Sequence, residues 1–381
     1  MPRMDSHKNI IYFHYASPAN SSFMYKKLGL NIPTNIFYIN DGEEEVFYVP
    51  FFEYDYLKKY SKNPSIKSIS ELAGFKKNYF DAIINFLKEK RKVIKIPALF
   101  PAWLLVKMLK NEVNVEVDNF YFLKPLLHKS IEEIKMIRKT ADGVKDCIEY
   151  VENVFSSVVC KNKFIYYKRK KLSAKLLSDM IGTFLLNRNI KSEFITVACG
   201  EFSYYPHCQI NHFLQPNKPI IIDLGVRDID NGYYVDVSRT YCIGKPENDK
   251  FINLYETIKN VKSRLEDSAC PGKLIAGAYR EAANLMSEQG IKMSKSNLIS
   301  NDNDLICHHS LGHGVGYDLH ELPIIDANAM VNFEKNMVIA IEPGAYVKDY
   351  GGIRIEDTYL ITEKGAENLT FGKYNFIINK K

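Results

Sequence analysis

Two apolar runs, each with an aspartate inside it, make up most of KPIIIDLGVRDIDNGYYVDVSRTYCIG, residues 218–244. The β-branched and aromatic residues of both runs favour strands, and RDIDNG between them favours a turn, so a β-hairpin is expected. With the turn centred between positions 229 and 230, Asp223 and Asp236 each lie 6.5 positions from the centre and are expected to face each other. Opposed Cβ atoms on paired strands are about 5 Å apart. Two carboxylates at that separation repel each other unless a divalent cation lies between them.

A second pair of strands is expected over NMVIAIEPG (336–344) and GGIRIEDTYLIT (351–362), which contain Glu342 and Glu356. Arg354 is two positions from Glu356 and therefore shares its face of the strand. An unpaired buried carboxylate is costly. A single buried acid is usually explained by a salt bridge, but four in one domain favour a shared cation. The recurrence of a strand pair also hints at an internal duplication.

Histidines are concentrated in HHSLGHGVGYDLHE (308–321), which holds four of the nine in the chain. His313 lies between two glycines, which are expected to let the backbone approach ions closely. A lone histidine is more often structural than a ligand, but this cluster, together with four buried acids, favours a metal site. A carboxylate-rich site with one imidazole suits Mn, Co, Zn or Fe. Two such ions would lower the pKa of a shared water and stabilise a tetrahedral intermediate.

Four segments resemble, in the same order, the metal-binding segments of the pita-bread metallopeptidases: IIDLGVRDIDNGYYVDVSRTY, LGHGVGYDLHE, AIEPG and GIRIEDTYLIT. This family includes methionine aminopeptidases, Xaa-Pro dipeptidases (prolidases) and Xaa-Pro aminopeptidases. The resemblance covers residues 125–381. This sequence departs from the family pattern in a longer turn between the two aspartates, and in SRTY where the family has TRTF.

The resemblance implies two bound divalent metal ions, with Mn or Co favoured and Zn or Fe as alternatives. It implies five metal ligands: Asp223, Asp236, His313, Glu342 and Glu356. Glu342 is also expected to act in catalysis, by accepting a proton and relaying it. The resemblance further implies that His207, His309 and His320 act in catalysis and contact substrate, and that Arg354 binds substrate. Each of these last four residues also fits a purely structural role.

The first third of the sequence alternates short strands and helices and contains none of these clusters. Strands are expected at 9–15, 35–40, 44–52, 93–97 and 113–117, and helices at 81–92 and 101–112. Ser130 followed by Glu133 is typical of a helix capping box. Apolar residues at steps of three and four then run from Ile131 to Phe155, so a long amphipathic helix is expected to open the second domain.

The expected fold is therefore an α/β N-terminal domain, residues 1–122, followed by an α+β pita-bread (creatinase/aminopeptidase) domain, residues 123–381. The first domain is similar in size and position to the N-terminal domain of creatinases and prolidases. Methionine aminopeptidases lack such a domain, so the layout favours the proline-specific branch of the family.

The function that this branch implies is hydrolysis of the bond between an N-terminal residue and proline, and an Xaa-Pro dipeptidase is favoured. The first alternative is an Xaa-Pro aminopeptidase that acts on longer peptides. Others are a non-catalytic pita-bread binding protein, a metal-independent relative such as creatinase, and a different metal-dependent amidase. The expected partners are a small peptide substrate and, from the resemblance alone, a second copy of the chain in a homodimer.

Composition argues against several other classes of protein. The net charge of +6 is not gathered into Lys/Arg-rich blocks with aromatics, so no nucleic-acid partner is expected. The sequence has no apolar run of about 18 residues, so no membrane span is expected. The seven cysteines are odd in number and form no CxxC pair, which favours a reduced compartment and a cytoplasmic location.

Overall fold

The computed structural model describes residues 9–73, 78–293 and 304–379, and it contains two compact units, Met1–Leu126 and Leu127–Lys381. The boundary expected after residue 122 lies within a short helix, α6 (Asn119–Leu123). Across the described ranges, every helix is too short or too polar to cross a membrane.

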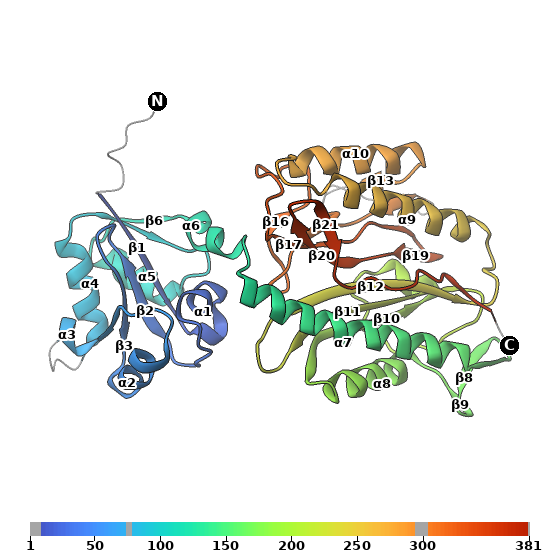
Figure 1. Ribbon diagram of the computed structural model, residues 1–381, viewed down its shortest axis with the longest axis horizontal. Coiled ribbons are helices and arrows are strands. Elements are labelled where there is room, and N and C mark those ends of the chain that lie inside the picture. Colours follow the sequence, from blue (N-terminus) through green and yellow to red (C-terminus); the bar gives the residue numbers. More distant parts are fainter. Residues whose placement is uncertain (1–8, 74–77, 294–303, 380–381) are drawn as a thin grey trace. The chain divides into compact units, whose positions relative to one another are not determined.

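The first unit is a six-stranded sheet with helices around it (Figure 1), in the strand order β4-β3-β2-β1-β5-β6. Neighbours β1, β2 and β3 are antiparallel, and the pairs β3–β4, β1–β5 and β5–β6 are parallel. The strands are β1 (Ile10–Ala16), β2 (Ile36–Asn40), β3 (Glu45–Val49), β4 (Ile66–Ser68), β5 (Val93–Ile96) and β6 (Val115–Val117). The helices are α1 (Ser22–Leu28), α2 (Phe51–Tyr60), α3 (Ser70–Ala73), α4 (Tyr79–Glu89), α5 (Ala102–Lys110) and α6.

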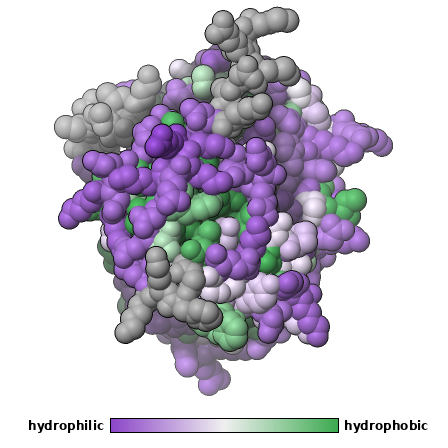
Figure 2. All heavy atoms as spheres, turned by 90° about the vertical axis from the view of Figure 1, so that its left-hand side faces the viewer, coloured by the Kyte–Doolittle hydropathy of each residue, from purple (hydrophilic) through white to green (hydrophobic). Residues whose placement is uncertain are grey.

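Every strand and helix expected in this unit is present within a few residues. One difference is at the end of the strand expected over 44–52, because Phe51 and Phe52 begin helix α2 instead. Both side chains are exposed, as is Trp103 of α5. The face drawn in Figure 2 carries its hydrophobic side chains in patches among hydrophilic ones.

The second unit opens with α7 (Ile131–Ser156), whose capping box is present as predicted: the Ser130 hydroxyl accepts from the Glu133 N–H, and Glu133 accepts from the Ser130 N–H. The apolar stripe is buried from Ile137 to Phe155, although Ile131 at its start is exposed. Helices α7 and α8 (Ala174–Leu186) pack against β10 (Ile190–Cys199), β11 (Pro219–Asp228) and β12 (Tyr234–Ile243). Helices α9 (Lys250–Ser268) and α10 (Ile275–Glu288) lie on the opposite side of the unit (Figure 1).

The remaining strands of this unit are short and belong to several sheets. Strands β10-β11-β12-β22 form one sheet, β13-β14-β18-β19 a second, β16-β15-β17-β20-β21 a third and β7-β8-β9 a fourth. Their bounds are β7 (Val159–Lys161), β8 (Phe164–Tyr167), β9 (Lys170–Lys171), β13 (Lys292–Met293), β14 (Leu305–Cys307), β15 (Gly312–Gly314), β16 (Glu321–Ile324), β17 (Val338–Ile341), β18 (Gly344–Val347), β19 (Gly351–Arg354), β20 (Asp357–Thr362), β21 (Gly365–Asn368) and β22 (Ile377–Ile378).

The hairpin of β11 and β12 forms as expected, but its predicted register is wrong. Asp223 pairs with Ser238, and Asp236 pairs with Gly225. The turn is centred one position later than assumed, because the Asp228 carboxylate accepts the N–H groups of the two residues that follow Ile229. Moving a turn centre by one position moves each partner by two, so both aspartates stay on one face of the hairpin as diagonal neighbours.

The second expected strand pair is also present, but neither strand is continuous. The strand expected over 336–344 breaks into β17 and β18 at Glu342-Pro343, and the one expected over 351–362 breaks into β19 and β20 at Ile355-Glu356. Each chain segment leaves one sheet and enters another at its break. Both glutamates therefore lie where the third sheet gives way to the second, rather than in the middle of a strand.

The glycines beside His313 lie against the backbone of neighbouring strands. A Cβ atom on Gly312 would lie 2.2 Å from the Ala340 carbonyl oxygen, and one on Gly314 would lie 2.2 Å from the Leu322 carbonyl oxygen. These glycines therefore let the neighbouring backbone of the same sheet approach β15 closely.

We expect Gly314→Ala to destabilise the protein by about 1–3 kcal/mol or more, because its methyl group collides with backbone that cannot move aside. Gly277→Ala in α10 is the matched control, since its Cβ would be 3.9 Å from the nearest atom. That change should stabilise the protein by about 0.5–1 kcal/mol, as alanine does in helices. Urea unfolding of both variants checks this, and equal stabilities would contradict the close-approach argument.

Candidate metal centre

Nine predicted site residues line one cavity of about 270 Å³ within the second unit. They come from separate strands and loops, and the sequence separation between the first and the last is large. The lining consists of the five predicted ligands Asp223, Asp236, His313, Glu342 and Glu356, the predicted substrate contacts His207, His309, His320 and Arg354, and four residues that were not predicted, Phe194, Pro206, Ser310 and Ile324.

The five predicted ligands form two overlapping groups. Oxygens of Asp223, Asp236 and Glu356 lie within 4.8 Å of one another, and so do the ligand atoms of His313, Glu342 and Glu356. Glu356 belongs to both groups, so it can bridge two ions. The diagonal placement of the two aspartates on the hairpin is thus compatible with a shared ion.

The tautomer of His313 directs a free nitrogen toward the carboxylates. Its Nδ1–H donates to the Gly314 carbonyl at 3.0 Å, which leaves Nε2 as the lone-pair nitrogen. Nε2 lies 3.6 Å from Asp236 Oδ2, 3.9 Å from Glu356 Oε1 and 4.0 Å from Glu342 Oε1. These distances are too long for hydrogen bonds. They suit two ligand atoms that each lie about 2.0–2.2 Å from a shared ion.

The electrostatics of the cavity call for positive charge. Burial, and then the neighbouring carboxylates, raise the pKa of Asp236, Glu342 and Glu356 well above their ordinary values. Burial lowers the pKa of His313 to about 4, so this imidazole stays neutral and cannot balance them. In addition, Asp236 Oδ1 and Glu356 Oε1 are buried without a hydrogen-bond partner. Two divalent cations would satisfy these oxygens and offset the repulsion, so the donor set fits the expected metals.

The Arg354 guanidinium already makes three hydrogen bonds within the site. Its Nη2 donates to Asp223 Oδ2 at 2.5 Å, Nη1 to the Tyr346 hydroxyl at 2.9 Å and Nε to Ser238 Oγ at 3.2 Å. The guanidinium therefore holds Asp223, one of the predicted metal ligands, in place. Because it has five N–H donors, two remain for another acceptor.

His309 is held on both sides of its ring. Its Nδ1 lies 2.7 Å from the Ser310 carbonyl oxygen and its Nε2 lies 2.8 Å from the Tyr346 hydroxyl. Since a carbonyl can only accept, Nδ1 carries the proton and Nε2 accepts from Tyr346. Burial lowers the pKa of His309 to about 3, which keeps it neutral. Nδ1 also lies 3.5 Å from Glu342 Oε2.

His320 and His207 are the exposed members of the set. The His320 ring lies 4.3 Å from that of His313, and one of its nitrogens can form a ligand group with Asp236 and His313. The geometry thus leaves His320 able to serve as a metal ligand as well as a substrate contact. His207 lies edge-on to Phe194, with ring centroids 6.4 Å apart.

Several residues in or next to the cavity carried no signal in the sequence. Tyr346 joins His309 to Arg354, yet a tyrosine in an apolar strand is ordinarily a core residue. Phe194 and Ile324 give the cavity an apolar wall, and they are indistinguishable from other strand residues until the fold places them.

The comparison with known families agrees with this geometry. The profile of metallopeptidase family M24 matches residues 136–363, which is more than half of the chain. The chain belongs to metallopeptidase family M24.

Relatives of this M24 peptidase extend the likeness to both units. It is 30% identical over 370 residues to the Xaa-Pro dipeptidase of Pyrococcus furiosus, covering 95% of this chain and 90% of that protein. The solved prolidase structure from Pyrococcus furiosus superposes with a TM-score of 0.74 at 26% identity, covering 97% of this chain and 98% of that one. The X-Pro aminopeptidase from Thermotoga maritima, at 16% identity and a TM-score of 0.72, shares the fold, covering 96% of this chain and 97% of that one. The predicted family, fold and enzyme class are confirmed.

We expect Asp236→Asn and Glu356→Gln to abolish peptidase activity and to reduce bound metal below two ions per chain. Removing one charged ligand weakens the field that holds the ions. Metal content after dialysis, measured by mass spectrometry, checks this. Asp228→Asn is the control, because Asp228 is a buried aspartate on the same hairpin that lies outside the cavity. Full metal content in both ligand variants would contradict the assignment.

Metal should stabilise the M24 peptidase more at neutral pH than at acidic pH. The folded-state pKa values of Asp236, Glu342 and Glu356 are raised above those of the unfolded chain, which are about 4. Without metal, the folded chain therefore binds more protons and loses stability as the pH rises through the raised values. Metal removes this loss, so the increase in Tm on adding Mn²⁺ to stripped protein should be larger at about pH 7.5 than at about pH 5. An equal increase at both pH values would contradict the raised pKa values.

Proposed function

We propose that this M24 peptidase is an Xaa-Pro dipeptidase that hydrolyses the bond between an N-terminal residue and proline. The observation that carries the proposal is the likeness to the Pyrococcus furiosus Xaa-Pro dipeptidase, which extends over 95% of the chain while a full set of metal donors converges on one cavity. The ligand set we propose is Asp223, Asp236, His313, Glu342 and Glu356.

Two divalent ions, Mn or Co by preference and Zn or Fe as alternatives, would supply Lewis acidity toward water and the scissile carbonyl. The proposed proton acceptor of this chain is Glu342. Its side chain is 15% exposed, whereas that of Asp223 is 5% and those of Asp236 and Glu356 are 3% exposed, so it is the most accessible of the four carboxylates. We propose that Glu342 itself passes this proton to the leaving nitrogen, because the neighbouring His309 Nδ1, 3.5 Å from Glu342 Oε2, already donates to the Ser310 carbonyl and cannot accept it.

The walls of the cavity suit a prolyl residue. Phe194, Pro206 and Ile324 offer an apolar surface for the ring, and a tertiary amide requires no acceptor because it has no N–H. We propose that the exposed His207 and His320 contact the peptide near the scissile bond. His320 is the proposed group that stabilises the developing oxyanion, because both ring nitrogens of His309 are already bonded to Ser310 and Tyr346.

The choice of a dipeptide depends on recognition of a free carboxylate. Arg354 keeps two N–H donors after its bonds to Asp223, Tyr346 and Ser238. We propose that these donors, with the exposed histidines, attract the C-terminal carboxylate of a dipeptide. An Xaa-Pro aminopeptidase would need no such contact and would accept longer chains.

We also propose a cytoplasmic homodimer. All seven cysteines are free thiols, which fits a reducing compartment. A homodimer would cover some of the exposed aromatic side chains of the first unit, such as Phe51, Phe52 and Trp103.

The substrate proposal predicts a clear order of rates. With Mn²⁺ or Co²⁺ added, kcat/KM should be highest for Ala-Pro and at least about tenfold lower for Ala-Pro-amide and Ala-Pro-Ala, because one lost charged contact is worth more than about 1.4 kcal/mol. Equal or greater rates on the blocked and longer peptides would favour the aminopeptidase. A Met-Ala peptide is the control, and it should be a poor substrate for either.

A further inference from the structure

A single backbone contact joins the hairpin that carries Asp236 to the segment that carries Glu356. Ser238 N–H donates to the Glu356 carbonyl at 3.3 Å, and Glu356 N–H donates to the Ser238 carbonyl at 3.0 Å. This contact lies at the break between β19 and β20, where the segment passes from one sheet to the other. We call this Ser238–Glu356 bridge the crossing. The relative position of Asp236 and Glu356 depends on the contacts that hold the crossing.

On both sides of the contact, a threonine hydroxyl replaces the backbone pair. Thr358 Oγ1 accepts from the Asp236 N–H at 3.0 Å and donates to the Asp236 carbonyl at 2.8 Å. On the other side, Thr240 Oγ1 donates to the Arg354 carbonyl at 2.8 Å and accepts from the Arg354 N–H at 3.0 Å. The strands thus diverge by the width of one hydroxyl, and each hydroxyl fixes the backbone of a residue in the metal cavity.

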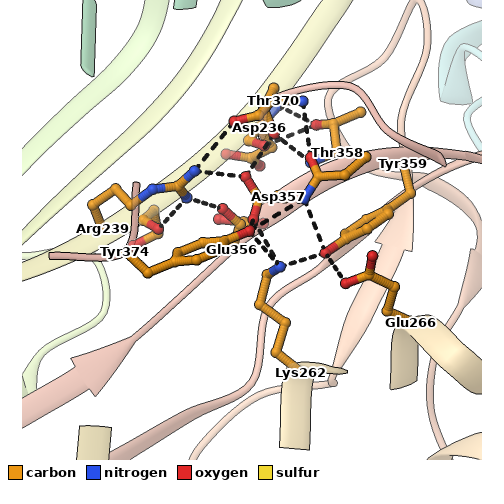
Figure 3. Close-up of polar contacts among 12 residues, drawn as sticks. Asp236, Arg239, Lys262, Glu266, Glu356, Asp357, Thr358, Tyr359, Thr370 and Tyr374 are labelled. Carbon is orange, nitrogen blue, oxygen red and sulfur yellow. Dashed lines mark hydrogen bonds and ion pairs between the residues drawn. The ribbon is translucent and has the colours of Figure 1, made fainter. Parts of the chain in front are cut away.

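The face opposite the cavity carries a buried ionic cluster, shown in Figure 3. Arg239, which follows Ser238, donates through Nη2 to Asp357 Oδ1 at 2.7 Å. Through Nη1 it donates to the Glu356 carbonyl at 2.6 Å and the Ser238 carbonyl at 3.0 Å. One guanidinium therefore clamps both carbonyls of the crossing and the residue next to Glu356.

Asp357 is held from every side by elements far apart in sequence. Its Oδ2 lies 2.8 Å from Lys262 Nζ of α9 and accepts from the Tyr374 hydroxyl at 2.6 Å. Its Oδ1 accepts from Thr370 Oγ1 at 2.8 Å, and Thr370 Oγ1 in turn accepts from the Thr358 N–H. Although burial opposes ionisation, Arg239 and Lys262 hold the pKa of Asp357 below its ordinary value, so the carboxylate is charged.

Stability alone gives little reason for such a cluster, because buried ion pairs often contribute less than well-packed apolar side chains would. The cluster does provide directional bonds at the one place where the two ligand-bearing segments meet. We propose that Arg239 and Asp357 are positioning residues that fix the spacing of Asp236 and Glu356 through the backbone of the crossing. This inference rests on the metal-binding part of the proposed function. It adds a role for Arg239 and Asp357, neither of which lines the cavity.

The first test is Asp357→Asn, which keeps the shape of the side chain and removes its charge. Metal-free protein is titrated with Co²⁺, and the visible absorption of the bound ion is recorded together with thermal unfolding. We expect a 10–100-fold loss of Co²⁺ affinity, as for other groups that orient metal ligands, and an altered absorption spectrum. Asp228→Asn, the matched control, removes the charge of a buried aspartate bonded to Lys139 at 2.8 Å and should change neither. Wild-type Co²⁺ affinity and spectrum in folded Asp357→Asn would overturn the proposal.

The second test remains informative even if Asp357→Asn fails to fold. Thr358→Val removes the hydroxyl that bonds both the N–H and the carbonyl of Asp236, whereas Thr358→Ser retains it. We expect the valine variant to bind Co²⁺ at least about tenfold more weakly and the serine variant to restore wild-type affinity. Equal Co²⁺ affinity in both would overturn the positioning role. A wild-type protein that binds no Co²⁺ would instead overturn the proposed function, so the two failures are distinguishable.

Discussion

Mutual repulsion among Asp223, Asp236, Glu342 and Glu356 is the constraint on which this structure depends. These carboxylates share a cavity from which water is largely removed, and burial there weakens their solvation as it strengthens their repulsion. The Arg354 guanidinium pairs with Asp223, while Asp236 Oδ1 and Glu356 Oε1 keep no hydrogen-bond partner and are available to ions. The same repulsion among carboxylates therefore lowers the stability of the second unit and favours the binding of metal ions.

The residues that line the cavity could be picked out in the sequence because acids and histidines are conspicuous in apolar strands. Asp223 and Asp236 interrupt strands in which a charge is costly, and His313 lies among histidines that are rare elsewhere. The order of elements in both units could also be anticipated, because strand and helix periodicities differ and the Ser130 capping box marks the start of α7. The structure brings the predicted acids and His313 into one cavity, as the hypothesis of a shared cation requires.

Other features could not be anticipated, because they depend on distances that local patterns do not encode. The register of the hairpin was missed by one turn position, since side-chain bonds of Asp228 determine where the turn closes. The breaks at Glu342 and Glu356 follow from the meeting of two sheets, which periodicity along one segment does not reveal. Tyr346 reads as a core aromatic until His309 and Arg354 are placed on either side of its hydroxyl.

The hydrogen bond from the Tyr374 hydroxyl to Asp357 has a consequence for the synthesis of the protein. The cluster behind Glu356 is complete only when Tyr374 has joined Lys262 of α9 and Arg239 of the central hairpin around Asp357. Translation therefore produces all five proposed ligands before it produces Tyr374, the last partner of the cluster behind them, because Glu356 precedes Tyr374 in the chain.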